Sequence, residues 1–187
     1  MSKRSQHSHN QIKGDNSNQQ VGNNNIVDRS VTHITEYHLP KESTMSNTFN
    51  FLEIFNESDI PEENEFIISN EPAKIFEKLE YNGAVGYREI SMLYTDDFVK
   101  FDKVILDFPD SMSIIRKLVH LFLKTKKIAK NSDETLELLS KEVASLIKSD
   151  DRFNPEKYRE EDLDSFVNGF IIYGIHKCKI LKNPNEK

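Results

Sequence analysis

The single cysteine, Cys178, is the side chain best suited to nucleophilic chemistry in this sequence. It lies between Lys177 and Lys179 and two residues after His176, and neighbouring positive charges lower the pKa of a thiol. It also belongs to the apolar side of the last predicted helix, where a cysteine usually behaves as a small buried hydrophobic residue. We therefore interpret Cys178 as a core residue, and a cysteine-dependent enzyme is an alternative hypothesis.

Histidines and carboxylates give weaker signals for chemistry. His7 and His9 stand two residues apart in a polar tail without a cysteine or carboxylate framework, so we expect no metal site there. His120, between two apolar residues, is interpreted as a partly exposed helix residue rather than a general base. Two groups of carboxylates are attributed to a helix N-terminus and to a loop, not to an acid–base pair. They are Glu160, Glu161, Asp162 and Asp164, and Asp96, Asp97, Asp102 and Asp107.

Lysines near the end of a predicted helix form the one basic cluster that could contact a phosphate or an acidic protein partner. The cluster consists of Lys124, Lys126, Lys127 and Lys130. No aromatic residues interleave with these lysines, and acidic predicted helices lie on both sides of them in the sequence. Lysines at this position also complement the helix dipole. We interpret the cluster mainly as a solvated surface and keep it as the candidate contact for a partner or a phosphate.

The overall composition disfavours several functional classes. The sequence has no glycine-rich nucleotide-binding motif, no nucleophile elbow and no C-x-x-C pair, so we expect neither enzyme activity nor a cofactor. The net charge is −6, and residues 1–38 hold four basic and three acidic residues, which leaves −7 for the remainder. An acidic body repels phosphate backbones at long range. We therefore expect no direct binding to nucleic acid.

The sequence also predicts where the chain resides. Its start, M-S-K-R-S-Q-H-S-H, lacks the apolar stretch of a signal peptide, and one cysteine cannot form an internal disulfide. The most apolar segment, residues 166–175, is interrupted by polar residues and glycines and falls short of the ~20 residues that a membrane span needs. We expect a soluble cytoplasmic protein that does not enter a membrane.

Residues 1–45 differ in composition from the rest and are predicted to form an Asn/Gly-rich arm with a strand near residues 26–39. The stretch Q-I-K-G-D-N-S-N-Q-Q-V-G-N-N-N-I-V sets single apolar residues among polar ones, with glycines eight positions apart. Strands that turn at Gly-Asx and stack asparagines between copies of a chain have this composition, and a flexible tail is the alternative. The candidates for self-assembly are Ile12, Gly14, Asn16, Val21, Gly22, Asn24 and Ile26.

Residues 46–187 are predicted to form a small helical bundle, so the expected fold class is mainly α with a β-forming arm before it. Apolar periodicity and capping residues place helices near 49–55, over 71–81, from Ser111 after the Asp110 cap, and after a cap at either Ser132 or Asn131. Residues 83–101 fit a helix broken at 95–97, with two short strands as the alternative. The last helix starts in the acidic residues at 160–164, ends with Ile180 and Leu181, and is apolar on nearly every side. Such a helix belongs in the middle of a bundle.

Two stretches together resemble a known group of proteins: I-K-G-D-N…Q-V-G-N-N-N-I at the start, and G-F-I-I-Y-G-I-H-K-C-K-I-L-K-N-P near the end. They look like the small modules attached to, or encoded with, bacterial ABC-three-component conflict systems. In such systems an ABC or SMC-like ATPase works with a small middle component and with an effector that has a helical C-terminal domain. The resemblance covers residues 11–27 and 166–184.

The resemblance implies a non-enzymatic protein–protein interaction or assembly module of a bacterial antiphage defence system. Such a module docks on a partner ATPase or effector nuclease, and the arm would make it a homo-oligomer. A small nucleic-acid-linked regulator, such as an antitoxin or repressor that uses the lysine cluster, is the alternative.

Self-assembly through the arm can be measured directly. The full chain is expected to elute as an oligomer, and a chain that begins at Ser46 as a monomer, in size-exclusion chromatography with light scattering. Spaced apolar residues and Gly-Asx turns favour pairing between copies rather than packing within one copy. Two monomeric chains would contradict this prediction.

Overall fold

The computed structural model describes residues 45–63, 73–177 and 180–185, which all belong to one unit of the chain that begins at His38. Within these residues there are only helices and connecting loops, without a strand. The predicted mainly helical fold is therefore confirmed for the described part. The arm with its expected strand, and the self-assembly candidates between Ile12 and Ile26, lie outside the described residues.

Seven α-helices and one 3-10 turn follow one another in this part of the chain. They are α1 (Met45–Glu57), α2 (Ile75–Tyr81), α3 (Val85–Leu93), α4 (Thr95–Val104), η1 (Ile105–Asp107), α5 (Ser111–Lys126), α6 (Ser132–Lys148) and α7 (Glu160–Lys177).

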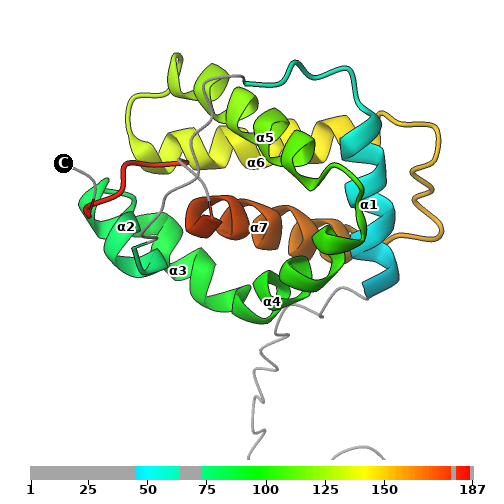
Figure 1. The fold of residues 1–187 in the computed structure, drawn as a ribbon, viewed down its shortest axis with the longest axis horizontal. Coiled ribbons are helices and arrows are strands. Elements are labelled where there is room, and N and C mark those ends of the chain that lie inside the picture. The colour runs from blue at the N-terminus through cyan, green and yellow to red at the C-terminus, as the bar shows by residue number, and fades with distance from the viewer. Residues whose placement is uncertain (1–44, 64–72, 178–179, 186–187) are drawn as a thin grey trace, which may run out of the picture. The chain divides into compact units, whose positions relative to one another are not determined.

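Helix α7 lies in the middle of the bundle. In Figure 1 it runs between α5 and α6 on one side and α3 and α4 on the other, with α1 crossing at one end. From Leu163 to Ile175 its residues are buried except for Asp164 and Asn168. The other helices therefore enclose α7, as the apolar sequence of this helix predicts.

Aromatic rings join α7 to two of the helices around it. Phe170 packs edge-on against Phe55 of α1, with 5.0 Å between ring centroids, and stacks with Phe101 of α4 at 5.5 Å. Phe166 packs edge-on against Phe51 of α1 at 5.2 Å. All five rings have an exposed fraction of 1% or less. Each buries a large apolar area, and these aromatic contacts add about 0.5–1.5 kcal/mol per pair beyond that burial.

Two helix starts follow the capping residues in the sequence. The side chain of Asp110 accepts a hydrogen bond from the backbone N–H of Ser113 at 3.1 Å, and α5 begins at Ser111. The side chain of Asn131 accepts one from the backbone N–H of Glu134 at 2.8 Å, so Asn131 rather than Ser132 caps α6. Each cap satisfies an N–H group that has no partner inside the helix.

Other boundaries differ from the sequence prediction. Helix α2 starts at Ile75 instead of residue 71, because Lys74 has an extended ψ of 143°. Helix α7 ends at Lys177, so Ile180 and Leu181 lie beyond it, and Leu181 has a positive φ of 70°. Residues 83–101 form two helices that meet at Tyr94, not strands.

The end of α7 is held by polar contacts far apart in the sequence. Lys78 of α2 is 2% exposed, and its Nζ donates a hydrogen bond to the carbonyl of Ile175 at 2.7 Å. A cation beside the last carbonyls of a helix complements its dipole. Asn82 exchanges two hydrogen bonds with the backbone of Lys182, at 2.7 and 2.9 Å, and its own carbonyl accepts one from Ser132.

Glycine at position 169 allows α4 and α7 to approach closely, and this gives a test of the packing. A Cβ atom there would lie 2.9 Å from the Cβ of Asp97 and 3.1 Å from the ring of Phe101. Gly169→Ala is expected to lower the free energy of unfolding by about 1–3 kcal/mol, because the helices must separate. Urea unfolding followed by circular dichroism measures the change.

Gly86→Ala is the matched control for this substitution. A Cβ atom at Gly86, in the first turn of α3, would lie 3.4 Å from the carboxylate of Asp133, which is ordinary contact, so stability should change by less than about 1 kcal/mol. Equal changes in the two variants would contradict the close approach at Gly169.

Candidate functional site

Several of the candidate acid–base carboxylates have structural partners. Asp97 is buried and pairs with Lys100 at 2.9 Å, and Asp102 pairs with Lys177 at 3.0 Å. Both lie in helix α4, as does Asp96, and Asp107 lies in the 3-10 turn, so the prediction that this group is scattered through a loop is wrong. Asp162 is buried in the first turn of α7, as predicted for the acidic start of that helix, and its side chain accepts a hydrogen bond from the backbone N–H of Arg159 at 3.3 Å.

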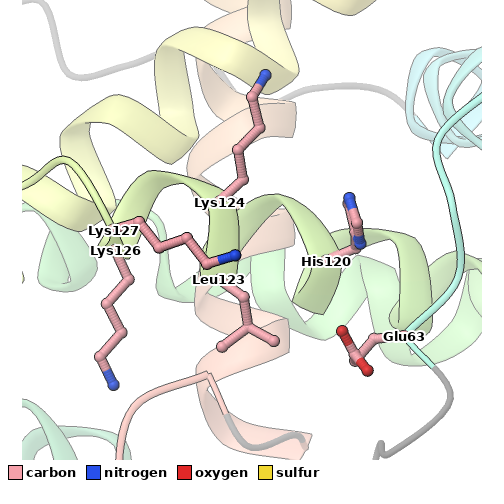
Figure 2. Close-up of a pocket in the computed structure, with 6 residues that line it drawn as sticks. All are labelled: Glu63, His120, Leu123, Lys124, Lys126 and Lys127. Carbon is pink, nitrogen blue, oxygen red and sulfur yellow. The ribbon is translucent and has the colours of Figure 1, made fainter.

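Three of the four clustered lysines line one open hollow on α5. The hollow has a volume of about 510 Å³. Its lining residues, which we call the lysine hollow and which Figure 2 shows, are Glu63, His120, Leu123, Lys124, Lys126 and Lys127. Lys130 does not line it, because α5 ends at Lys126 and Lys130 lies in the turn before α6.

The lysine side chains of the hollow point in different directions. Lys124 reaches towards α6 and pairs with Glu142 at 3.4 Å, whereas the Nζ of Lys126 lies 5.8 Å from the ring centroid of Phe122. Figure 2 shows the ammonium groups of Lys124 and Lys126 on opposite sides of the helix, with Lys127 extending along it between them. The three cations therefore do not converge on one point, as they would around a single phosphate group.

Exposed apolar side chains lie among these lysines. Leu123 lines the hollow with an exposed fraction of 37%, and Ile128, just after α5, is 70% exposed. Neither residue stands out in the sequence as a candidate. Leu123 lies next to the apolar residues of α5 that face the core, and Ile128 lies past the end of that helix. The sequence pattern that could have identified them is the position of large apolar residues directly beside lysines.

Glu63, at the end of the described range 45–63, lines the same hollow. Its neighbour Glu62 accepts hydrogen bonds from Ser113 at 2.8 Å and from Arg116 at 3.1 Å. The Ser113 and Arg116 contacts hold the pKa of the Glu62 carboxyl below its usual range. The backbone N–H of Glu63 donates to the carbonyl of Arg116. Glu63 is 57 positions from His120, so the sequence gives no local signal that the two residues line one hollow.

The remaining sequence candidates lie outside the described residues: Cys178, His7 and His9. Within residues 45–63, 73–177 and 180–185, no three metal-ligating side chains gather into a possible metal site. In the same residues, every helix is too short or too polar to cross a bilayer.

No family model, curated protein or solved structure matches this chain. The geometry of the described residues is therefore the basis on which a function can be proposed.

The lysines of the hollow are expected to contribute little to stability. Replacing Lys124, Lys126 and Lys127 together by glutamine should lower the free energy of unfolding by about 2 kcal/mol or less, because exposed ion pairs and dipole effects are weak. Urea unfolding measures this change. Phe122→Ala, at a buried position of the same helix, should cost about 3–5 kcal/mol. A similar loss in the lysine variant would show a structural role for these residues.

Proposed function

We propose that this chain is a non-enzymatic protein-interaction module whose helical domain binds an acidic, partly apolar segment of a partner protein at the lysine hollow. The observation that carries this proposal is the exposure of Leu123 in the hollow among Lys124, Lys126 and Lys127, with the exposed Ile128 next to Lys127 in the chain. The non-enzymatic character is supported by the use of candidate carboxylates in ion pairs and a cap.

The charge of the hollow selects the type of partner. Its lysines form a local basic surface on a chain with a net charge of −6. An acidic partner segment would meet favourable charges where these lysines gather. This charge attraction determines where and in which orientation the segment binds, and contributes less to its affinity. The ion pair between Lys124 and Glu142 is solvent-exposed on both sides, so exchanging Glu142 for a partner carboxylate costs little.

The apolar residues supply the binding energy. Covering a fully exposed leucine or isoleucine side chain contributes about 1.5–3 kcal/mol, and Leu123 and Ile128 contribute in proportion to the 37% and 70% of their surface that is still exposed. A partner that covers Leu123 and Ile128 therefore gains more from them than from exposed ion pairs, and the lysine stems can pack along the same apolar surface.

The same features fit a protein better than a nucleic acid. Phosphate backbones do not bury leucine or isoleucine, and single-stranded nucleic acids need exposed aromatic rings on which bases stack. The aromatic residue nearest to these lysines in α5, Phe122, is buried at 3% exposure. The long-range field of an acidic chain also opposes phosphate.

The resemblance described above suggests the biological setting. We propose that the partner is an ABC or SMC-like ATPase or an effector nuclease of a bacterial antiphage system in the cytoplasm, and that the N-terminal arm assembles copies of the chain.

Direct binding assays distinguish a protein partner from a nucleic acid. Fluorescence anisotropy with a labelled helical peptide of alternating Glu and Leu faces should give saturable binding to the full chain, and a DNA duplex of similar charge should bind at least tenfold more weakly. The Lys124→Gln, Lys126→Gln, Lys127→Gln variant should bind the peptide about tenfold more weakly, which corresponds to about 1.4 kcal/mol.

A charge-matched variant controls for the loss of three lysines. Lys103, Lys141 and Lys157 are exposed and do not line the hollow, so their joint replacement by glutamine should change peptide binding less than about twofold.

Tighter binding of DNA, with a steep fall in affinity between about 50 mM and 200 mM salt, would favour the nucleic-acid-linked regulator. Failure of the peptide to bind would contradict docking at the hollow. Phage plating on cells that carry the gene with its neighbours, with either variant, tests the defence role.

A further inference from the structure

Two Asn-Gly dipeptides occur in this sequence, Asn82-Gly83 and Asn168-Gly169. In such a pair the backbone nitrogen of the glycine can attack the side-chain carbonyl carbon of the asparagine, because glycine has no Cβ atom to hinder the approach. The reaction, called deamidation, converts the asparagine amide into a carboxylate without an enzyme. The structure decides which of the two dipeptides can react in the folded chain.

The two dipeptides lie in different surroundings. Asn168-Gly169 belongs to the enclosed helix α7, where Gly169 is buried and the amide of Asn168 donates to the carbonyl of Asp164 at 2.9 Å. Asn82-Gly83 follows the short helix α2, and Gly83 is exposed with a positive φ of 68°. The core must open before Asn168 can react, whereas a turn on the surface can open locally.

The side chain of Asn82 ties this turn to the C-terminal segment, residues 180–185. Its Nδ2 donates to the carbonyls of Lys78 and Lys182, both at 2.7 Å, and its Oδ1 accepts from the backbone N–H of Lys182 at 2.9 Å. We call these three hydrogen bonds the Asn82 clasp. In Figure 1 the red C-terminal segment accordingly runs beside α2.

The segment that the clasp holds packs against the end of α7. Ile180 is fully buried and Leu181 is 6% exposed. Ile180 lies so close to Gly174 of α7 that a Cβ atom on this glycine would be 2.6 Å from its Cδ1. Leu181 has a positive φ of 70°, a backbone conformation that is unfavourable for a residue with a side chain. The clasp therefore holds a closely packed and strained segment in place.

The closed clasp slows deamidation of Asn82 without preventing it. It fixes the amide against two carbonyls, and the attacking nitrogen of Gly83 donates its proton to the carbonyl of Glu80 at 3.0 Å. However, α2 has only seven residues, and no side chain caps its start. Such a short helix is marginal by itself, so its end opens more often than the whole domain unfolds.

We propose that Asn82 is a site of spontaneous deamidation in the folded protein, and that the new carboxylate releases the C-terminal segment from α2. The nitrogen of Gly83 forms a bond to Cγ of Asn82, and the bond from Cγ to Nδ2 breaks. Ammonia leaves with the proton that Gly83 loses, and water then opens the cyclic imide to aspartate or isoaspartate. This inference does not depend on the proposed function.

The product cannot form the clasp. A carboxylate has no proton to donate, so the oxygen that replaces Nδ2 would face the carbonyl oxygens of Lys78 and Lys182. Two hydrogen bonds are lost, and repulsion between oxygens takes their place. Water is the only co-reactant and ammonia is lost to solution, so the change runs in one direction. The clasp is thus a one-way switch that responds to time and to pH.

Peptide mass spectrometry of the full chain, incubated at neutral and at mildly alkaline pH, tests the reaction. In the folded chain Asn82 is expected to deamidate roughly tenfold faster than Asn168 or more, because local opening is more frequent than opening of the core. In urea the two sites should react at similar rates, which controls for their different neighbours. The rate at Asn82 should rise with pH, since the attacking nitrogen has to lose its proton.

Two results of this experiment would overturn the proposal. One is an equal or faster reaction at Asn168 in the folded chain. The other is a reaction at Asn82 that is more than about a hundredfold slower in the folded chain than in urea, because the turn would then open no more readily than a buried element.

Asn82→Asp carries the side chain of the product and tests the release. Hydrogen exchange of the peptide that contains residues 180–185 should be about tenfold faster than in the unaltered chain, because two hydrogen bonds of the clasp are lost. Asn185→Asp is the matched control, since it places the same carboxylate at an exposed position of the same segment and should leave the exchange unchanged. Circular dichroism checks that both variants fold.

The deamidated chain itself gives a second measurement of release. Ion exchange separates it from the unreacted chain, and its residues 180–185 should exchange as fast as those of Asn82→Asp. Unchanged exchange in both the variant and the deamidated chain, or an equal acceleration in Asn185→Asp, would show that the clasp does not hold the segment.

Discussion

The enclosure of α7 is the constraint on which the described structure depends. A helix that is apolar on all sides cannot face water on any of them, so other helices must surround it. Helices α1 and α4 do so with aromatic rings that pack against Phe166 and Phe170 of α7. Gly169 lets α4 approach α7 closely. The remaining helices then need only one apolar face each, and their outer faces are free to carry polar and charged residues.

The division between inner and outer faces also decides where function can lie. The lysine hollow occupies the outer face of α5, whose inner face packs Ile114, Leu118 and Phe122 into the core. A second hollow lies at the end of α7, where His176 and Ile172 line it together with residues of α2 and of the junction of α3 and α4.

Much of this fold could be predicted from local sequence, because apolar periodicity and capping residues act within a few positions. The starts of α5 and α6 at the Asp110 and Asn131 caps and the central place of α7 follow from such signals. Two other arrangements could not be predicted, since they join residues 57 and 97 positions apart: Glu63 lines the same hollow as His120, and Lys78 of the short helix α2 is buried against the carbonyl of Ile175. The grouping of Lys124, Lys126 and Lys127 was predictable, but the hollow between them was not.

The place of α7 in the chain order affects how the protein is made. Six of the described helices precede it, so translation completes all of them before it completes the helix that they enclose. At about 5–20 residues per second, α1 is complete on the order of ten seconds before α7, and α6 about a few seconds before it. During that time the rings of Phe51, Phe55 and Phe101 lack the partners Phe166 and Phe170 that cover them in the folded protein.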